Sequence, residues 1–236
     1  MTSIMRWAAI AATALLSAAS AHAAEKRFGL TSFAAIEVGA DVDVEVVTRA
    51  PVSAVATGPQ DALDRLSVEN RDGRLVIGMR QFAGDDRRGI SPGAVLLRIN
   101  AATLQSATLV GAGSLHIDGM KGQRVALGLR GPGKLSVDAV DTDRLAVAMI
   151  GNGTLTLAGK AKQAQMTLSG SGVVDAGKLA VDGLISDSEG TGDHIFNAVK
   201  SAAITTRGSG KTVVLGRPVC TVRNVGTGTV ACGRAR

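Results

Sequence analysis

Two glycines separated by a single residue recur at a nearly constant interval through the second half of the chain. The first glycines of successive pairs are 20, 20, 19, 20, 18 and 18 residues apart. The seven pairs are Gly111 and Gly113, Gly131 and Gly133, Gly151 and Gly153, Gly170 and Gly172, Gly190 and Gly192, Gly208 and Gly210, and Gly226 and Gly228. Self-similarity at a fixed period is typical of a repeat architecture, in which each unit packs against the next. The sequence therefore predicts a stack of similar units.

The residues around each pair alternate between apolar and polar side chains. Counted from the first glycine, positions −2, +4 and +6 are mostly aliphatic, and the odd positions between them are mostly polar. A period of two is typical of a β-strand with one buried face, and glycine allows a tight corner because it adopts positive φ without steric cost. We therefore predict an all-β fold, a parallel β-solenoid whose coils stack about 4.8 Å apart, with the fourteen glycines as structural corners. Leu109, Leu129 and Met149 should then form one column inside it.

Other architectures explain the pattern less well. Helical repeats need a period near 3.6, which is missing, and each glycine would cost a helix about 1 kcal/mol relative to alanine. A phosphate-binding glycine loop should be followed by a helix, whereas strand-like alternation follows each pair. A β-sandwich stays open as an alternative, but it does not predict one motif at one period.

The residues before the repeats are also predicted to be β-structure. Val38, Val42, Val44 and Val46 alternate with Asp41, Asp43 and Glu45, which predicts one strand with one buried face. Residues 66–70 and 75–77 flank an Asp-Gly turn and predict a hairpin. We also predict a short helical turn over 59–63, a polar loop over 81–92 and a strand over 94–99. Residues 24–100 should cap or extend the N-terminal end of the solenoid, because an open end is an aggregation edge, and residues 101–236 should form the Gly-x-Gly coils.

The first 23 residues resemble a signal peptide. A charged start ending at Arg6 precedes the apolar stretch 7–16 and an Ala21-His22-Ala23 cleavage signal. A membrane anchor is the alternative, but spanning needs about 20 apolar residues. We therefore predict export with cleavage after Ala23, no transmembrane segment in the mature chain, and the periplasm as the destination, with the cell surface or secretion as alternatives.

Charge gives little indication of a partner. The chain has 26 Lys or Arg and 20 Asp or Glu, a formal net charge of +6. We interpret the basic residues as dispersed among the acids, without a run that resembles a nucleic-acid-binding arm. No nucleic-acid partner is therefore expected, and no cofactor or metal is predicted.

Three stretches resemble the head GIN domain family, whose members are labelled "putative auto-transporter adhesins". They are LSGSGV at 168–173, RGSGKTV at 207–213 and the opening FAAIEVGADV at 33–42. The resemblance covers roughly residues 28–216. It implies a right-handed parallel β-helix in the bacterial envelope, and the family offers no catalytic residues to transfer.

Two cysteines flank the last glycine pair. Cys220 and Cys232 lie six residues before and six residues after Gly226. In an oxidising compartment we expect them to form a disulfide that closes the terminal coil, if its two arms fold back within the Cα separation of about 4.4–6.8 Å that such a bond needs. The alternative is a reactive or metal-binding pair.

One stretch is rich in chemically active side chains. The tentative polar cluster consists of Asp187, Ser188, Asp193, His194 and Thr206. A serine and a histidine near an acid can activate a nucleophile, and Asp and His can hold a cation. The alternative is a polar core in which Ser188, His194 and Thr206 replace leucines while Asp187 and Asp193 face water.

These observations favour a non-enzymatic scaffold of the cell envelope that serves adhesion or binds a protein or polymer. The outward positions carry many hydroxyls, interpreted as one flat face: Thr108, Ser136, Thr154, Thr156, Thr167, Ser171, Thr191, Thr205 and Ser209. The alternative function is a polysaccharide-acting β-helix enzyme, a lyase or hydrolase, with its site near His194. Such sites need paired carboxylates or a base and often aromatic platforms, whereas the chain has four Phe, no Tyr, and one Trp that lies in the leader.

Overall fold

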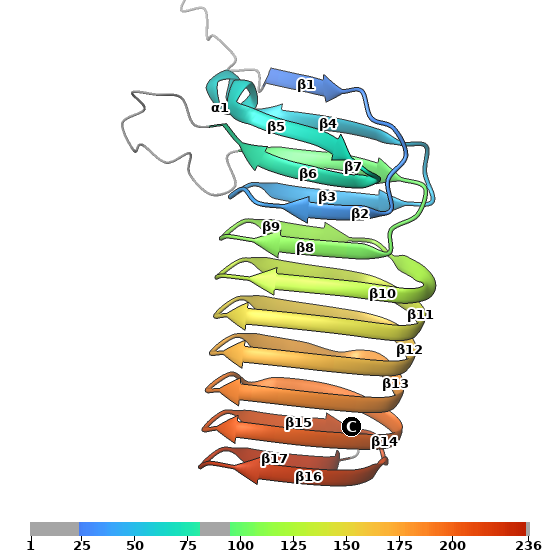
Figure 1. Ribbon diagram of the computed structural model, residues 1–236, viewed down its shortest axis with the longest axis vertical. Coiled ribbons are helices and arrows are strands. Elements are labelled where there is room, and N and C mark those ends of the chain that lie inside the picture. Colours follow the sequence, from blue (N-terminus) through green and yellow to red (C-terminus); the bar gives the residue numbers. More distant parts are fainter. Residues whose placement is uncertain (1–23, 81–94, 235–236) are drawn as a thin grey trace, which may run out of the picture.

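The chain winds into a β-solenoid of about six turns, seen in Figure 1 as a flattened stack with strands on a front and a back side. The structure is a computed structural model, and it describes residues 24–80 and 95–234. The predicted leader (1–23) and most of the predicted polar loop (81–92) lie outside the described residues. No helix within the described ranges is long and apolar enough to cross a membrane.

The repeats form ten consecutive strands in the order of the sequence. They are β8 (Ser106–Val110), β9 (Ser114–Ile117), β10 (Met120–Arg130), β11 (Lys134–Gly151), β12 (Thr154–Gly170), β13 (Val173–Gly190), β14 (His194–Gly208), β15 (Lys211–Leu215), β16 (Val219–Val225) and β17 (Thr229–Arg234). Each long strand runs along one side, bends around a rounded edge and returns along the other side to the next Gly-x-Gly corner (Figure 1). All pairings between these coils are parallel.

The register stacks equivalent residues on one another, as the sequence predicts. Leu129 pairs with Leu109 on one side and with Met149 on the other, and Met149 pairs in turn with Leu168. All four side chains are buried. The predicted column is therefore confirmed, and with it the parallel solenoid.

The two glycines of a pair are required for different reasons. Gly151 has φ +120°, a left-handed conformation that side chains disfavour. Gly153 lies against the preceding coil, where a Cβ would stand 2.6 Å from the carbonyl oxygen of Gly133. The first position thus needs the backbone freedom of glycine, and the second needs the absence of a side chain.

The N-terminal segment continues the stack and then changes its pairing. β2 (Ala35–Val38) and β3 (Asp43–Thr48) pair parallel with β8 and β9, and β6 (Arg74–Met79) and β7 (Leu96–Ala101) pair parallel with β2 and β3. Beyond them the pairing is antiparallel: β5 (Leu66–Arg71) on β6, β4 (Ser53–Gly58) on β7, and β1 (Ala24–Phe28) on β4. The helix α1 (Gln60–Arg65) lies beside β1 and β4 at this end (Figure 1).

The local predictions for this segment are largely confirmed. The hairpin around Asp72 and Gly73 is present as β5 and β6, and the helical turn is present as α1. The run of valines up to Val46 is not one strand, however, because a corner at residues 39–42 separates β2 from β3. This corner stacks on the first Gly-x-Gly corner, where a Cβ on Gly113 would meet the carbonyl oxygen of Val42 at 2.5 Å.

Candidate functional site

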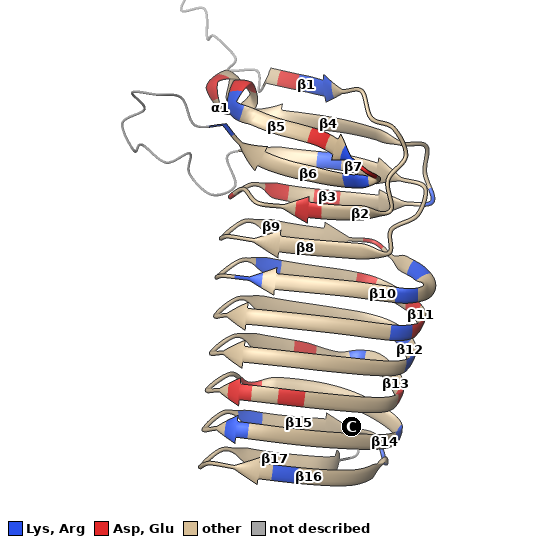
Figure 2. Cartoon of the chain, viewed as in Figure 1, with Lys and Arg blue, Asp and Glu red and all other residues tan. Residues whose placement is uncertain are grey.

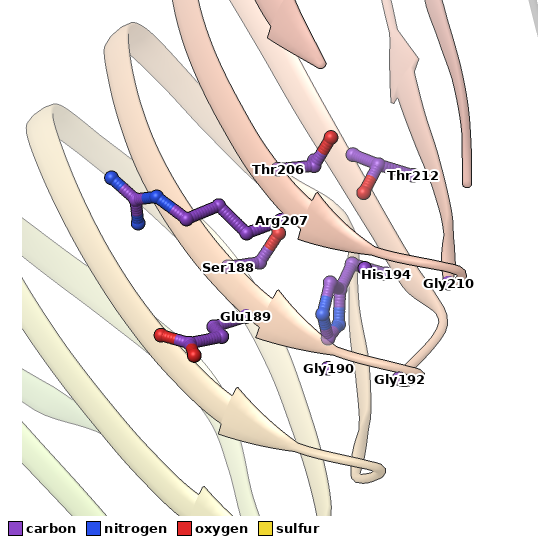
Figure 3. Close-up of a pocket in the computed structure, with 10 residues that line it drawn as sticks. Ser188, Glu189, Gly190, Gly192, His194, Thr206, Arg207, Gly210 and Thr212 are labelled. Atoms are coloured by element: carbon purple, nitrogen blue, oxygen red, sulfur yellow. The ribbon is translucent and has the colours of Figure 1, made fainter. Parts of the chain in front are cut away.

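The interior of the last coils is polar where the earlier coils are aliphatic. The column of Leu109 and Leu168 continues as Ser188 and Thr206, and the column of Leu115 and Val174 continues as His194 and Thr212. Four polar side chains at these positions are buried, at most 8% exposed: Ser188, His194, Thr206 and Thr212. Figure 3 shows these side chains close to one another beside the glycine corners. Three members of the predicted polar cluster therefore lie together inside the solenoid.

The hydrogen bonding of this interior is incomplete. Thr206 Oγ1 donates to Asn224 Oδ1 at 2.7 Å, and Asn224 Nδ2 donates to the carbonyl oxygen of Gly228 at 2.8 Å. His194 Nδ1 and Ser186 Oγ are buried without a hydrogen-bond partner among the described residues. An unsatisfied buried polar group costs about 1–3 kcal/mol.

Burial also determines the charge of the histidine. Desolvation lowers the pKa of His194, and the neighbouring charge and backbone carbonyl of Asp193 offset this only in part. The imidazole is therefore neutral near pH 7. Its ring lies against Phe196, with 6.1 Å between the two ring centroids.

The two carboxylates of the predicted cluster point away from the interior. Asp187 Oδ1 accepts a hydrogen bond from Arg207 Nη1 at 2.7 Å, and both side chains are about half exposed. Asp193 is exposed and accepts from the backbone N–H of Lys211 at 2.9 Å. In the part of the chain that the structure describes, no hydrogen bond joins the imidazole of His194 to Ser188 or to either carboxylate. The structure does not assemble a serine–histidine–acid relay.

The space beside His194 is too small for a substrate. It is a cavity of about 10 Å³ bordered by Ser188, His194, Thr206 and Thr212 together with corner glycines. About 10–15 Å³ is the minimum for one water molecule. The cavity can accommodate at most a water, which would have the free Nδ1 of His194 as one partner.

A larger hollow lies on the outside and was not anticipated from the sequence. It measures about 470 Å³ and crosses several coils near the rounded edge. Ser106, Ala126 and Ala146 stack as a column of small outward side chains along it. Arg124 and Arg144 stack in register beside them, and within the described ranges neither has an acidic partner. The signal in the sequence was the recurrence of Ala five residues, and Arg seven residues, before successive corner glycines.

The outward hydroxyls do not form a single face. The strands before each corner carry Thr108, Thr167 and Thr205, the strands after it carry Ser136, Thr154 and Thr156, and the corners carry Ser171, Thr191 and Ser209. The interpretation of one flat face is therefore wrong, because the corner reverses the chain and sends the two strands of a coil to opposite sides.

The two cysteines form a disulfide between β16 and β17, with 6.4 Å between their Cα atoms. The bond spans the terminal coil, and neither sulfur is a free thiol. Within residues 24–80 and 95–234, no group of three or more His, Cys, Asp or Glu side chains is arranged to hold a metal ion.

The stacked parallel coils, the filled interior and the glycine corners define an all-β solenoid protein. The family model described as "Putative auto-transporter adhesin, head GIN domain" matches residues 32–218, and the chain belongs to this family. This confirms the resemblance noted in the sequence. Among curated proteins, no sequence matches the chain.

Solved structures share the fold at low sequence identity. A putative adhesin from Bacteroides fragilis superposes with a TM-score of 0.80 at 22% identity, covering 90% of this chain and 97% of its own. A putative lipid binding protein from Parabacteroides distasonis gives 0.72 at 18% identity, covering 91% and 98%. A putative adhesin from Parabacteroides merdae gives 0.71 at 18% identity, also covering 91% and 98%. These likenesses establish the fold.

Proposed function

We propose that the chain is an exported, non-enzymatic protein of the bacterial cell envelope, whose solenoid is a scaffold for adhesion or for binding a protein or polymer. The observation that carries the proposal is the filled interior. The aliphatic columns inside the described coils are buried, and the space beside His194 measures only about 10 Å³, so a partner contacts the outer surface. Membership of a family described as adhesins supports the same function.

Two features support export. The first 23 residues have the composition of a signal peptide. The disulfide between Cys220 and Cys232 is of a kind that persists in oxidising compartments and is rare in the cytosol. The periplasm is therefore the proposed first destination, and the processed chain begins at Ala24.

The hollow beside Arg124 and Arg144 is the proposed contact surface along the rod. Two like charges in direct register repel each other, and an acidic group on a partner would relieve this repulsion. The adjoining column of Ser106, Ala126 and Ala146 leaves room for a chain to approach the sheet.

We propose no catalytic role for the polar cluster, because Asp187 and Asp193 lie outside the solenoid while His194 lies inside it. A direct check is an assay of the wild type and of His194→Ala against uronate polymers and neutral glycans. Neither protein should release products. Cleavage that disappears in His194→Ala would establish the enzymatic alternative instead.

The central test is cell fractionation followed by crosslinking. The full chain should appear in the periplasmic or envelope fraction with its N-terminus at Ala24 and no free thiol, and a chain without residues 1–23 should stay in the cytoplasm. Crosslinked partners should be lost from Arg124→Gln/Arg144→Gln and kept by the control Lys134→Gln/Lys178→Gln, which removes two exposed charges after the corners. Retention of the intact chain in the cytoplasm would refute the proposal.

A further inference from the structure

Positive charge is concentrated at the C-terminal end of the chain. Residues 194–236 contain seven Lys or Arg and no Asp or Glu, whereas residues 1–193 contain 19 Lys or Arg and 20 Asp or Glu. The interpretation of basic residues dispersed among acids is therefore wrong for this end. In Figure 2 the visible parts of β14 to β17 carry blue segments and no red ones.

Among the basic side chains that the structure describes near the C-terminal end, those of the last two residues, Arg217 and Arg223, have no acidic partner. Lys200 and Arg207 reach back to Asp182 and Asp187 of the preceding coil, each at 2.7 Å. Arg217 and Arg223 are exposed, and within the described residues neither forms an ion pair. The tip therefore presents uncompensated cationic side chains.

Apolar side chains are exposed at the same end. Val219, Val222 and Val225 of β16 are 77%, 44% and 51% exposed. Val222 continues the inner column of Ile204, but among the described strands β16 is the last one on its side, so no described strand covers it. We call the exposed side chains of Arg217, Val219, Val222, Arg223 and Val225 the C-terminal tip.

We propose that the C-terminal tip docks on an anionic lipid surface, the valines contacting the headgroup layer and the arginines the lipid phosphates. The inference rests on the proposed function, which places the chain beside envelope membranes. Basic side chains combined with exposed apolar ones are typical of surfaces that bind at the membrane interface. Docking is shallow, because the open backbone edge of β16 needs water that the hydrocarbon layer does not offer.

Charge and exposed valine together distinguish this partner from two others. A second copy meeting the tip end to end would place arginines against arginines, which repel. A soluble acidic polymer would bind Arg217 and Arg223 but would leave Val219 in water. Of these three partners, the lipid surface is the one that uses both kinds of side chain.

The experiment is flotation of the protein, purified from cells that export it, with vesicles of phosphatidylcholine alone or mixed with phosphatidylglycerol. The wild type should float with the mixed vesicles and stay behind with phosphatidylcholine alone. Arg217→Gln/Arg223→Gln should weaken binding about thirtyfold, at about tenfold per 1.4 kcal/mol. Val219→Ser should weaken it about fivefold. The matched control Lys134→Gln/Lys178→Gln removes the same charge from exposed positions in the middle of the stack and should bind as the wild type does.

Three results would overturn the proposal. The first is equal flotation with neutral vesicles, and the second is equal weakening of binding by the control pair. The third is unchanged vesicle binding of Val219→Ser together with full competition by heparin, which would indicate a soluble acidic polymer as the partner. The disulfide and the unfolding midpoint of each variant establish that it is folded. Fractionation of the same variants separates the two proposals. If neither the wild type nor the tip variant binds vesicles, while both are exported and crosslink to envelope partners, the docking proposal is wrong and the scaffold proposal stands.

Discussion

The coils up to residue 184 and the coils after it share one backbone geometry but have different interiors. Leu115, Leu135 and Leu155 fill one column of the earlier coils with side chains at most 1% exposed. The same column continues as His194 and Thr212. Parallel pairing and the glycine corners persist across this transition. Coil geometry is therefore set by the backbone, and the side chains inside it decide how much each coil contributes to stability.

The two ends of the rod differ in a related way. The N-terminal end closes with antiparallel strands β1, β4 and β5 and the helix α1. The C-terminal end keeps parallel pairing to its last strands and is joined across by the disulfide. An open sheet edge is a liability that proteins cover or constrain. We infer that the disulfide takes the place that the cap has at the other end.

The largest effect is expected where two backbones touch. Gly153→Ala would place a Cβ 2.6 Å from the carbonyl oxygen of Gly133 and 2.8 Å from that of Gly131, and no side chain can move to relieve the clash. We expect a loss of more than about 4 kcal/mol in the free energy of unfolding, or failure to fold. Denaturant unfolding is the measurement. Asn152→Ala, at the exposed residue between the two glycines, is the control and should change stability by less than about 0.5 kcal/mol.

A leucine of the aliphatic interior should contribute more to the free energy of unfolding than a polar residue in the same column. Leu135→Ala should cost about 2–5 kcal/mol, because it leaves a cavity in a packed core. Thr212→Ala removes far fewer apolar contacts and should cost about 1 kcal/mol. Chemical denaturation of both variants decides the comparison. Equal losses in the free energy of unfolding would mean that the polar interior stabilises the fold as much as the aliphatic interior does.

Loss of the disulfide should affect the C-terminal end alone. In the chain-entropy model a loop of about this length contributes roughly 3 kcal/mol. We expect Cys220→Ser/Cys232→Ser to lower the stability of β16 and β17 by this order, with faster amide exchange there and unchanged exchange in β10 to β12. Exchange that rises along the whole rod would contradict the local role.

Acid should weaken the polar interior through His194. Because burial lowers the pKa of His194 in the folded chain, the unfolded chain binds the proton first as the pH falls. Stability should be full above the unfolded pKa of about 6.5 and should decline as the pH falls from there toward the lower folded pKa. His194→Leu should remove this component of the pH dependence, which urea unfolding between pH 7 and 5 measures.

The same substitution should also raise stability at neutral pH, and this is the smallest effect. His194→Leu removes the unpaired Nδ1 and restores the residue type found at Leu115, Leu135 and Leu155 of the column. A gain of about 1 kcal/mol is expected. A loss instead would indicate that a buried water completes the hydrogen bonding of the imidazole.

Sequence reasoning recovered the coil and its inner columns because both are local properties. A glycine corner and an alternation with a period of two each depend on only a few neighbouring residues. Their recurrence at one interval determines which residues of successive coils stack on one another. The corner at residues 39–42 was missed because alternation continues through it. The hollow beside Arg124 and Arg144 was missed because its shape arises from side chains on separate coils.

The sequence by itself therefore determined that glycine pairs turn the chain into coils, that aliphatic residues line them, and where two cysteines flank the last corner. The tertiary structure decided which coils meet the N-terminal strands, that His194 lies inside while Asp187 and Asp193 lie outside, and that the acid-free segment forms the last described coils of the stack. The physical reason is range: dihedral preference and side-chain alternation are fixed between neighbours, whereas burial, clefts and edges exist only once distant segments have packed.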